Sequence, residues 1–157
     1  MSPAYERLVQ HLDNRDVRYR ANDDAGLICV DFSGDVGTYR MIASVDEEGD
    51  LFEMYGCAPV RVPEGARPSI AETIVRANYG LKVGKFEMDY DDGELRVHVA
   101  HVLTEGELDD AVIARLFGTG MALLDRYLPA VLSVIYGNEL PRDAIRSAEQ
   151  PDVSEAA

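Results

Sequence analysis

The chain has 157 residues, of which 46% are hydrophobic and 28% charged, a composition ordinary for one globular domain that can bury a core. Its formal net charge of −14, with no basic stripe, argues against a nucleic-acid partner, because phosphate binding depends on clustered Lys and Arg. Its apolar runs are shorter than the about 18 residues of a membrane span, and its start lacks the basic-then-apolar order of a secretory signal.

These limits predict a cytoplasmic protein that does not contact membranes. The acidic excess either keeps such a protein soluble or attracts basic partners. Cys29 and Cys57 lie in strand-like runs, where a buried inert thiol is the default and a disulfide between neighbouring strands is the alternative. They do not form a zinc motif, and we expect neither a metal nor a cofactor.

The first predicted helix begins at Ser2 as the N-cap, with Pro3 at the first helical position, and ends near Asn14. Its apolar face consists of residues at helical spacing: Tyr5, Leu8, Val9 and Leu12. His11 lies off this face and has no cysteine or acidic partner at metal-ligand spacing. We interpret it as a surface residue.

Four strands are predicted next. Residues 17 to 21 (Val17 to Ala21) are short and polar, which is typical of a sheet edge. The dense apolar run from Leu27 to Phe32 indicates a central strand. Alternation from Thr38 to Val45 and a further run from Leu51 to Cys57 complete an antiparallel meander.

A second helix is predicted after a proline-rich loop. Ser69, with Glu72 three residues later, resembles a capping box, and Gly80 is the expected end of the helix. The stripe predicted to be buried contains Ile70, Ile74, Val75 and Tyr79.

Residues 78–96 are the most informative stretch. Asp92-Gly93, between two alternating runs, predicts a hairpin with a two-residue type I′ turn. In that register the apolar pairs are Tyr90 with Leu95, Met88 with Val97, and Phe86 with Val99; the polar pairs are Asp89 with Arg96 and Glu87 with His98. A slip of one residue would oppose apolar and charged side chains, so the register is expected to be well specified.

Three motifs in this part of the chain resemble functional sites. Residues 80–85 resemble a phosphate loop, but they are one residue short and lead into a strand instead of a helix. The acidic residues around Gly93 resemble a calcium loop, but Met88 occupies the first ligand position. His98 and His101, three apart in a strand, point to opposite faces. We therefore predict no catalytic, cofactor-binding or metal-binding residue.

The last predicted helix is long. Thr104 to Glu107 has the pattern of a capping box, and apolar residues from Leu108 to Ile135 keep helical spacing for about eight turns. Pro129 predicts a kink or break near residues 126–128. We expect a folded domain over residues 1–140 and a flexible acidic tail over residues 141–157, with a short helical turn near residues 143–149 as an open possibility.

The predicted order is α-β-β-β-β-α-β-β-α, an α+β protein with an antiparallel sheet and helices packed on one face. With this order the chain resembles the YbjN family of bacterial proteins over about residues 3–138. The residues that carry the resemblance are Asn78-Tyr79, Gly84-Lys85-Phe86-Glu87, Asp92-Gly93-Glu94-Leu95, Tyr127-Leu128-Pro129-Ala130 and Gly137. The resemblance implies a fold like that of type III secretion chaperones, which are small acidic proteins, often dimeric, that bind unfolded or extended client segments. Family members are labelled sensory transduction regulators, and no catalytic motif comes with the family.

Three functions follow as hypotheses. The first is a non-catalytic protein-binding module, chaperone-like or regulatory, that binds a protein client or regulatory partner through the edge at residues 17–21 or through an outer sheet face. That face is predicted to carry Lys85, Glu87, Asp89, Arg96 and His98. The alternative is a small-ligand-binding domain or an enzyme whose site is assembled from distant residues, although no catalytic motif occurs. The third is a homodimer through the final helix, which carries apolar residues on more than one face.

Overall fold

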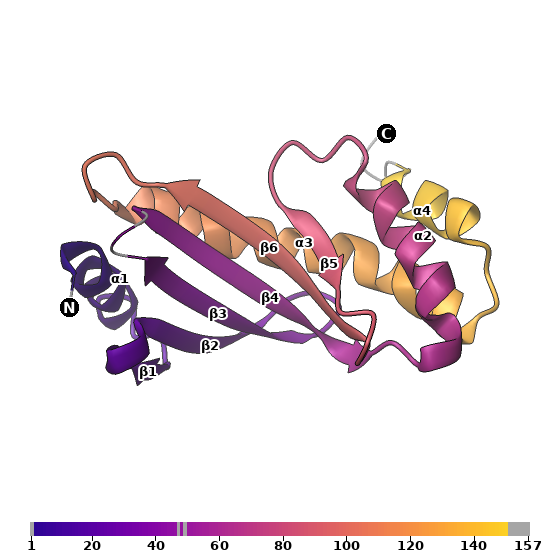
Figure 1. Cartoon of the computed structure of the whole chain (residues 1–157), viewed down its shortest axis with the longest axis horizontal. Helices are drawn as coiled ribbons and strands as arrows, with labels where there is room; N and C mark the ends of the chain where they lie inside the picture. The colour runs from indigo at the N-terminus through magenta and orange to yellow at the C-terminus, as the bar shows by residue number, and fades with distance from the viewer. Residues whose placement is uncertain (1, 47, 49, 151–157) are drawn as a thin grey trace.

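The computed structural model describes residues 2–46, 48 and 50–150. Its sheet has six strands, all antiparallel to their neighbours, in the order β1-β2-β3-β4-β6-β5 (Figure 1). The strands are β1 (Arg20–Asn22), β2 (Leu27–Ser33), β3 (Thr38–Asp46), β4 (Leu51–Arg61), β5 (Lys85–Met88) and β6 (Glu94–Val102). The helices are α1 (Pro3–Asp13), α2 (Arg67–Asn78), α3 (Asp110–Tyr136) and α4 (Pro141–Glu149). The predicted fold class and element order are confirmed, with α4 added.

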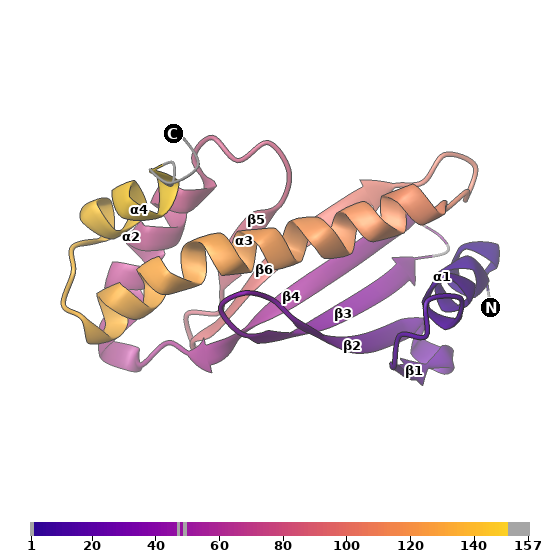
Figure 2. The same ribbon diagram turned by 180° about the vertical axis from the view of Figure 1, so that it is seen from behind.

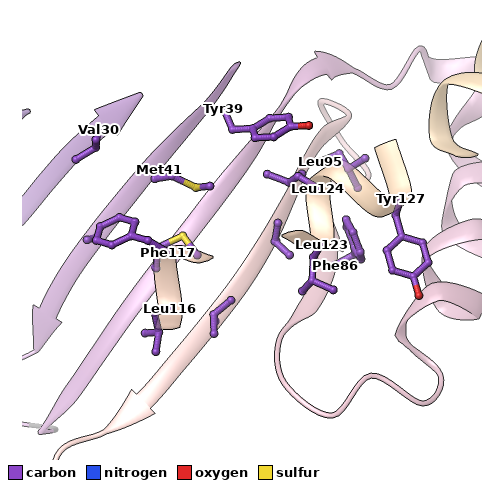
Figure 3. Packing of buried hydrophobic residues seen from close by; sticks show 14 of the residues in the cluster. Val30, Tyr39, Met41, Phe86, Leu95, Leu116, Phe117, Leu123, Leu124 and Tyr127 are labelled. Carbon is purple, nitrogen blue, oxygen red and sulfur yellow. The ribbon is translucent and has the colours of Figure 1, made fainter. Parts of the chain in front are cut away.

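Alternation along the strands determines which face of the sheet is buried. In β3, Tyr39, Met41 and Ala43 are buried while the residues between them are not. Helix α3 lies across this face, and α1 and α2 with α4 lie at opposite ends of the sheet (Figure 2). Apolar side chains of the sheet and of α3 interdigitate between the two layers (Figure 3).

Two edge-to-face aromatic contacts join α3 to the sheet. The ring centroids of Phe32 and Phe117 are 5.3 Å apart, and those of Phe86 and Tyr127 are 5.5 Å apart. Between them Gly120 lets the helix approach closely, because a Cβ there would lie 2.2 Å from the terminal methyl of Met54. This glycine therefore serves close packing between the helix and the sheet.

The hairpin register differs from the predicted one by two residues. Phe86 pairs with Val97 and Met88 with Leu95, and the turn runs from Asp89 to Gly93 instead of consisting of Asp92-Gly93. The predicted type I′ turn is therefore wrong. Because side chains alternate with a period of two, the shift leaves each residue of the two strands on its predicted face. Tyr90, which was expected to be paired, lies in the turn and is exposed.

Helix α2 begins earlier and buries a different stripe. It starts at Arg67, its N-cap position Ala66 makes no side-chain hydrogen bond, and Ser69 lies inside the first turn, so the predicted capping box is wrong. The buried residues are Ile70, Thr73 and Ala77. Two residues of the predicted stripe, Val75 and Tyr79, are exposed instead.

The long helix also begins later than predicted. Its N-cap is Asp109, whose side chain accepts a hydrogen bond from the amide of Val112 at 2.8 Å, so Thr104 to Glu107 is not a capping box. The helix continues through Pro129 without a break.

The predicted flexible tail is wrong for its first part. Residues 141–149 form α4, which packs against α3 and α2 and buries Ala144 and Ile145. The rest of that prediction, residues 151–157, lies outside the described residues. Within the described part of the chain, no helix is both long enough and apolar enough to cross a membrane.

Helix α1 is anchored through a residue that was interpreted as exposed. The N-cap Ser2 and Pro3 are confirmed, but His11 is buried, with only 4% of its surface exposed. Its Nδ1 lies 2.7 Å from the carboxylate of Asp110, the first residue of α3. This partner is 99 residues away in sequence, so local spacing could not reveal it.

Candidate protein-binding surface

One face of the sheet lies opposite α3, and none of the described helices crosses it (Figure 1). We call it the outer face. Two adjacent rows of side chains run across its strands. The strand pairing orders the first as Cys29, Ile42, Tyr55, His98 and Lys85, and the second as Asp31, Arg40, Cys57, Arg96 and Glu87.

Tyr55 is the centre of this surface. The guanidinium of Arg96 lies 4.1 Å from the centre of its ring, and the His98 ring stacks on it with centroids 4.6 Å apart. His98 Nε2 lies 2.8 Å from a carboxylate oxygen of Glu53, and the Tyr55 hydroxyl donates to the same oxygen at 3.5 Å. The cation–π contact with Arg96 and the stacking with His98 hold these two side chains against the Tyr55 ring.

The charges beside this cluster neutralise one another. Glu87 accepts from Arg96 at 2.9 Å and lies 3.1 Å from the ammonium of Lys85. Burial acts to raise the pKa of Glu87, but the hydrogen bonds from Lys85 and Arg96 outweigh it and hold that pKa below its ordinary value. Glu87 is therefore ionised at neutral pH, and the outer face presents paired charges around an aromatic centre.

The outer face also carries both cysteines, and both thiols are free. The disulfide considered from the sequence is therefore not formed, and the thiols are half-buried instead of fully buried. Cys57 lines a cleft of about 610 Å³ beside an irregularity in β4 between Cys57 and Arg61. Burial raises the pKa of the Cys57 thiol, which disfavours the reactive thiolate.

The two sheet edges differ in what they can bind. At β5, the Asn78 side chain accepts from the amide of Phe86 at 2.7 Å and donates to its carbonyl at 3.0 Å, so these backbone groups are already paired. At the other edge, β1 covers Arg20–Asn22 instead of residues 17–21, and its three residues are exposed. Addition of a strand, which needs a free edge, therefore has only a short template at β1.

Four of the five residues predicted for the outer face lie together there. Lys85, Glu87, Arg96 and His98 occupy facing positions on β5 and β6. Asp89 is in the turn, where its amide donates to Glu94, so it does not belong to the face. Sequence reasoning missed Tyr55 and Glu53, because the pairing of β4 with β6 joins segments about 45 residues apart.

A second cleft, of about 670 Å³, lies between the start of α1 and the segment that leads into α3. Its acidic lining residues are Asp46, Asp50, Glu105, Glu107 and Asp109. His101 also lines it. Among the described residues, no group of three or more His, Cys, Asp or Glu side chains is placed to hold a metal ion.

The fold and the surface define a class of protein: a small α+β chain whose antiparallel sheet is covered on one face and open on the other. The chain belongs to the YbjN family, described as "Putative bacterial sensory transduction regulator", whose model matches residues 4–133. The resemblance found in the sequence is thus confirmed.

One solved structure agrees with this assignment at the level of the fold. The crystal structure of YbjN from E. coli, described as "a putative transcription regulator", is 16% identical and superposes with a TM-score of 0.53 over 77% of this chain and 85% of that chain. A chain of the HopA1-SchA chaperone-effector complex has 15% identity and a TM-score of 0.48 over 78% of this chain and 88% of its own. No curated protein matches the sequence.

Proposed function

We propose that this chain is a non-catalytic protein-binding module of the bacterial cytoplasm, chaperone-like or regulatory, that recognises its partner through the outer face. The observation that carries the proposal is the aromatic and ionic cluster around Tyr55 on a sheet face that the described helices leave open. The family description as a regulator supports the same general role.

The cluster has the properties of a protein-binding centre. Tyr and Arg are enriched among the residues that contribute most to protein interfaces, because they bury large rigid areas and still form hydrogen bonds. Here Arg96 and His98 are already stacked on Tyr55 and held by Glu87 and Glu53. A partner that covers the face therefore loses little side-chain entropy.

Recognition by the face is favoured over addition of a strand. At β5, the side chain of Asn78 already pairs with the backbone of Phe86, and at the other edge β1 is only three residues long. Neither of these two described edges therefore offers a long row of unpaired backbone groups. The face instead offers side chains from five strands.

A homodimer through the final helix was expected because that helix carries apolar residues on more than one face, and its packing weakens this argument. The apolar residues that α3 carries beyond its contact with the sheet pack against α4, α2 and α1. Its exposed positions before the last turn are mostly small or charged, such as Ala111, Ala114 and Arg115, and the large exposed aromatic Tyr136 lies at its C-terminal end.

Site-specific photo-crosslinking in living cells tests the proposal. A photoreactive phenylalanine at Ile42, on the outer face, is expected to give a discrete protein adduct, and the same residue at Ala114, on the exposed side of α3, is not. The captured protein, once purified, should bind the unmodified chain, and Arg96→Glu should weaken that binding by about tenfold or more. Equal adducts from both positions, or binding insensitive to Arg96→Glu, would contradict the proposal.

A further inference from the structure

Helix α2 and its C-cap residue present two large apolar side chains to solvent. Val75 and Tyr79 lie one turn apart, and their exposed fractions are 68% and 90%. Their helical spacing predicted that both would be buried. Neighbouring apolar side chains that are both exposed indicate a candidate interaction surface.

A groove runs between α2 and α4, which lie side by side (Figure 2). Each helix contributes four residues at the spacing i, i+3, i+4, i+7, which is one face over two turns. From α2 and its C-cap Tyr79 these are Glu72, Val75, Arg76 and Tyr79, and from α4 they are Arg142, Ile145, Arg146 and Glu149. The groove has a volume of about 620 Å³. The side chain of Ile145, only 6% exposed, forms its floor.

Tyr79 is held in its exposed position by its neighbour. The side chain of Asn78 makes two hydrogen bonds to the backbone of Phe86, so the end of α2 is tied to the sheet. The amide of Tyr79 donates to the carbonyl of Val75 at 3.2 Å. Because the backbone that carries the ring is already ordered, binding to it costs little conformational entropy.

The groove differs in charge from the chain as a whole. Its lining has three arginines, on α2 and α4, and two glutamates. Glu72 accepts from Arg76 at 3.1 Å, and Glu149 accepts from the hydroxyl of Tyr127 at 3.0 Å. On α4, Arg142 is 3.9 Å from its nearest carboxylate, and Arg146 has no ion pair within the described residues. In a chain of net charge −14, the charge that this groove offers to a partner is positive.

We propose that the groove between α2 and α4 binds an acidic amphipathic α-helix of a partner protein. Two parallel stripes of helical residues form the seat that a third helix fills with its own apolar stripe. Val75, Tyr79 and Ile145 contact that stripe, and Arg142 and Arg146 pair with the acidic residues beside it. This site is separate from the outer face and does not depend on the function proposed for that face.

Peptide binding to the purified full chain tests this site. The probe is a fluorescein-labelled peptide of about 15 residues, long enough to hold two helical turns, with Leu at helical spacing and Glu beside it. Two matched peptides replace every Glu with Lys or scramble the order so that the apolar stripe is lost. Fluorescence anisotropy is expected to show binding of the acidic amphipathic peptide in the micromolar range, about tenfold or more tighter than either matched peptide.

Variants of the protein locate the binding. Tyr79→Ala and Arg146→Glu should each weaken the peptide by about tenfold or more, because both residues are exposed and change contacts without emptying the core. Tyr90→Ala, another exposed tyrosine, and Arg115→Glu, an exposed arginine on α3, should leave the affinity within about twofold.

Each remaining result overturns the proposal. Equal binding of the acidic and basic peptides would show that charge does not select the occupant. Equal effects of the groove variants and the control variants would place the peptide elsewhere. A mass that rises with protein concentration and falls on Tyr79→Ala would identify a second copy of the chain as the occupant. Absence of peptide binding to the purified chain would overturn this proposal, and intact capture at the outer face would then leave the function proposed above unaffected.

Discussion

Asp125 shows how one side chain fixes a loop to the core. Its carboxylate accepts hydrogen bonds from the amides of Asp35 at 2.9 Å and Val36 at 3.1 Å and from the hydroxyl of Tyr39 at 2.5 Å. The loop between β2 and β3 is thereby tied to α3. Gly34 permits this approach, because a Cβ there would lie 2.5 Å from the carboxylate.

Removal of this carboxylate should destabilise the protein. Asp125→Ala leaves two amides and one hydroxyl without their charged acceptor, and we expect the free energy of unfolding to fall by about 2 kcal/mol. Urea denaturation followed by circular dichroism measures the change. The control is Asp31→Ala, which breaks an exposed ion pair with Arg40 and should cost less than about 1 kcal/mol. Equal losses in the two variants would contradict the role given to Asp125.

The same residue predicts a dependence of stability on pH. Burial acts to raise the pKa of Asp125, but the hydrogen bonds from Tyr39, Asp35 and Val36 outweigh it and hold that pKa below its ordinary value of 3.8. The stabilisation is therefore present above the unfolded pKa and is lost as pH falls through the folded pKa. Between pH 6 and pH 3, Asp125→Asn should lose less stability than the unaltered chain, because the amide does not titrate. Parallel curves from urea denaturation would exclude this contribution.

At the scale of elements, the β5–β6 hairpin and α2 support each other. The longer turn shifts the pairing by two residues, and Phe86 then faces the Tyr127 ring of α3. Asn78, at the end of α2, occupies the outward backbone groups of Phe86. The helix thus orders a strand of only four residues and closes one edge of the sheet.

Replacement of Asn78 should loosen this strand. Asn78→Ala removes both hydrogen bonds to Phe86, and we expect a loss of about 1–3 kcal/mol with faster exchange of the Phe86 amide proton. Asn78→Asp keeps the acceptor for that amide but has no donor for the carbonyl, so its loss should be smaller. Hydrogen exchange monitored by NMR gives both readouts. Unchanged Phe86 exchange in Asn78→Ala would show that the strand is ordered by its pairing with β6 alone.

At the scale of the molecule, α4 belongs to the same core as α1. The core cluster extends from Ala4 to Ile145, so both ends of the described chain contribute buried residues to it. We therefore expect one folding unit, with α4 unfolding together with the sheet.

Ile145→Ala tests whether α4 is part of that unit. Its side chain is buried, and we expect its truncation to cost about 2–4 kcal/mol while denaturation remains a single cooperative transition. Arg142→Ala, an exposed change on the same helix, should cost less than about 0.5 kcal/mol. A separate early transition in Ile145→Ala would show that α4 docks on a core that folds without it.

Short-range sequence patterns predicted most of the elements and, for the strands, which residues share a face. Alternation at Tyr39, Met41 and Ala43 identified a strand and its buried side, and Ser2 identified the start of α1, because both signals act over a few residues. The sequence also placed Lys85, Glu87, Arg96 and His98 on one face correctly. An error of two residues in register preserves the faces.

Tertiary structure alone decided which residues meet. The pairing of β4 with β6 brings Tyr55 and Glu53 to His98, and the start of α3 brings Asp110 to His11. Val75 and Tyr79 have the spacing of buried residues, yet they are exposed because α2 packs on β5, α3 and α4 through another stripe. Periodicity defines the faces of an element, but the packing of neighbouring elements determines which face is covered. Both proposed binding sites arise from that packing.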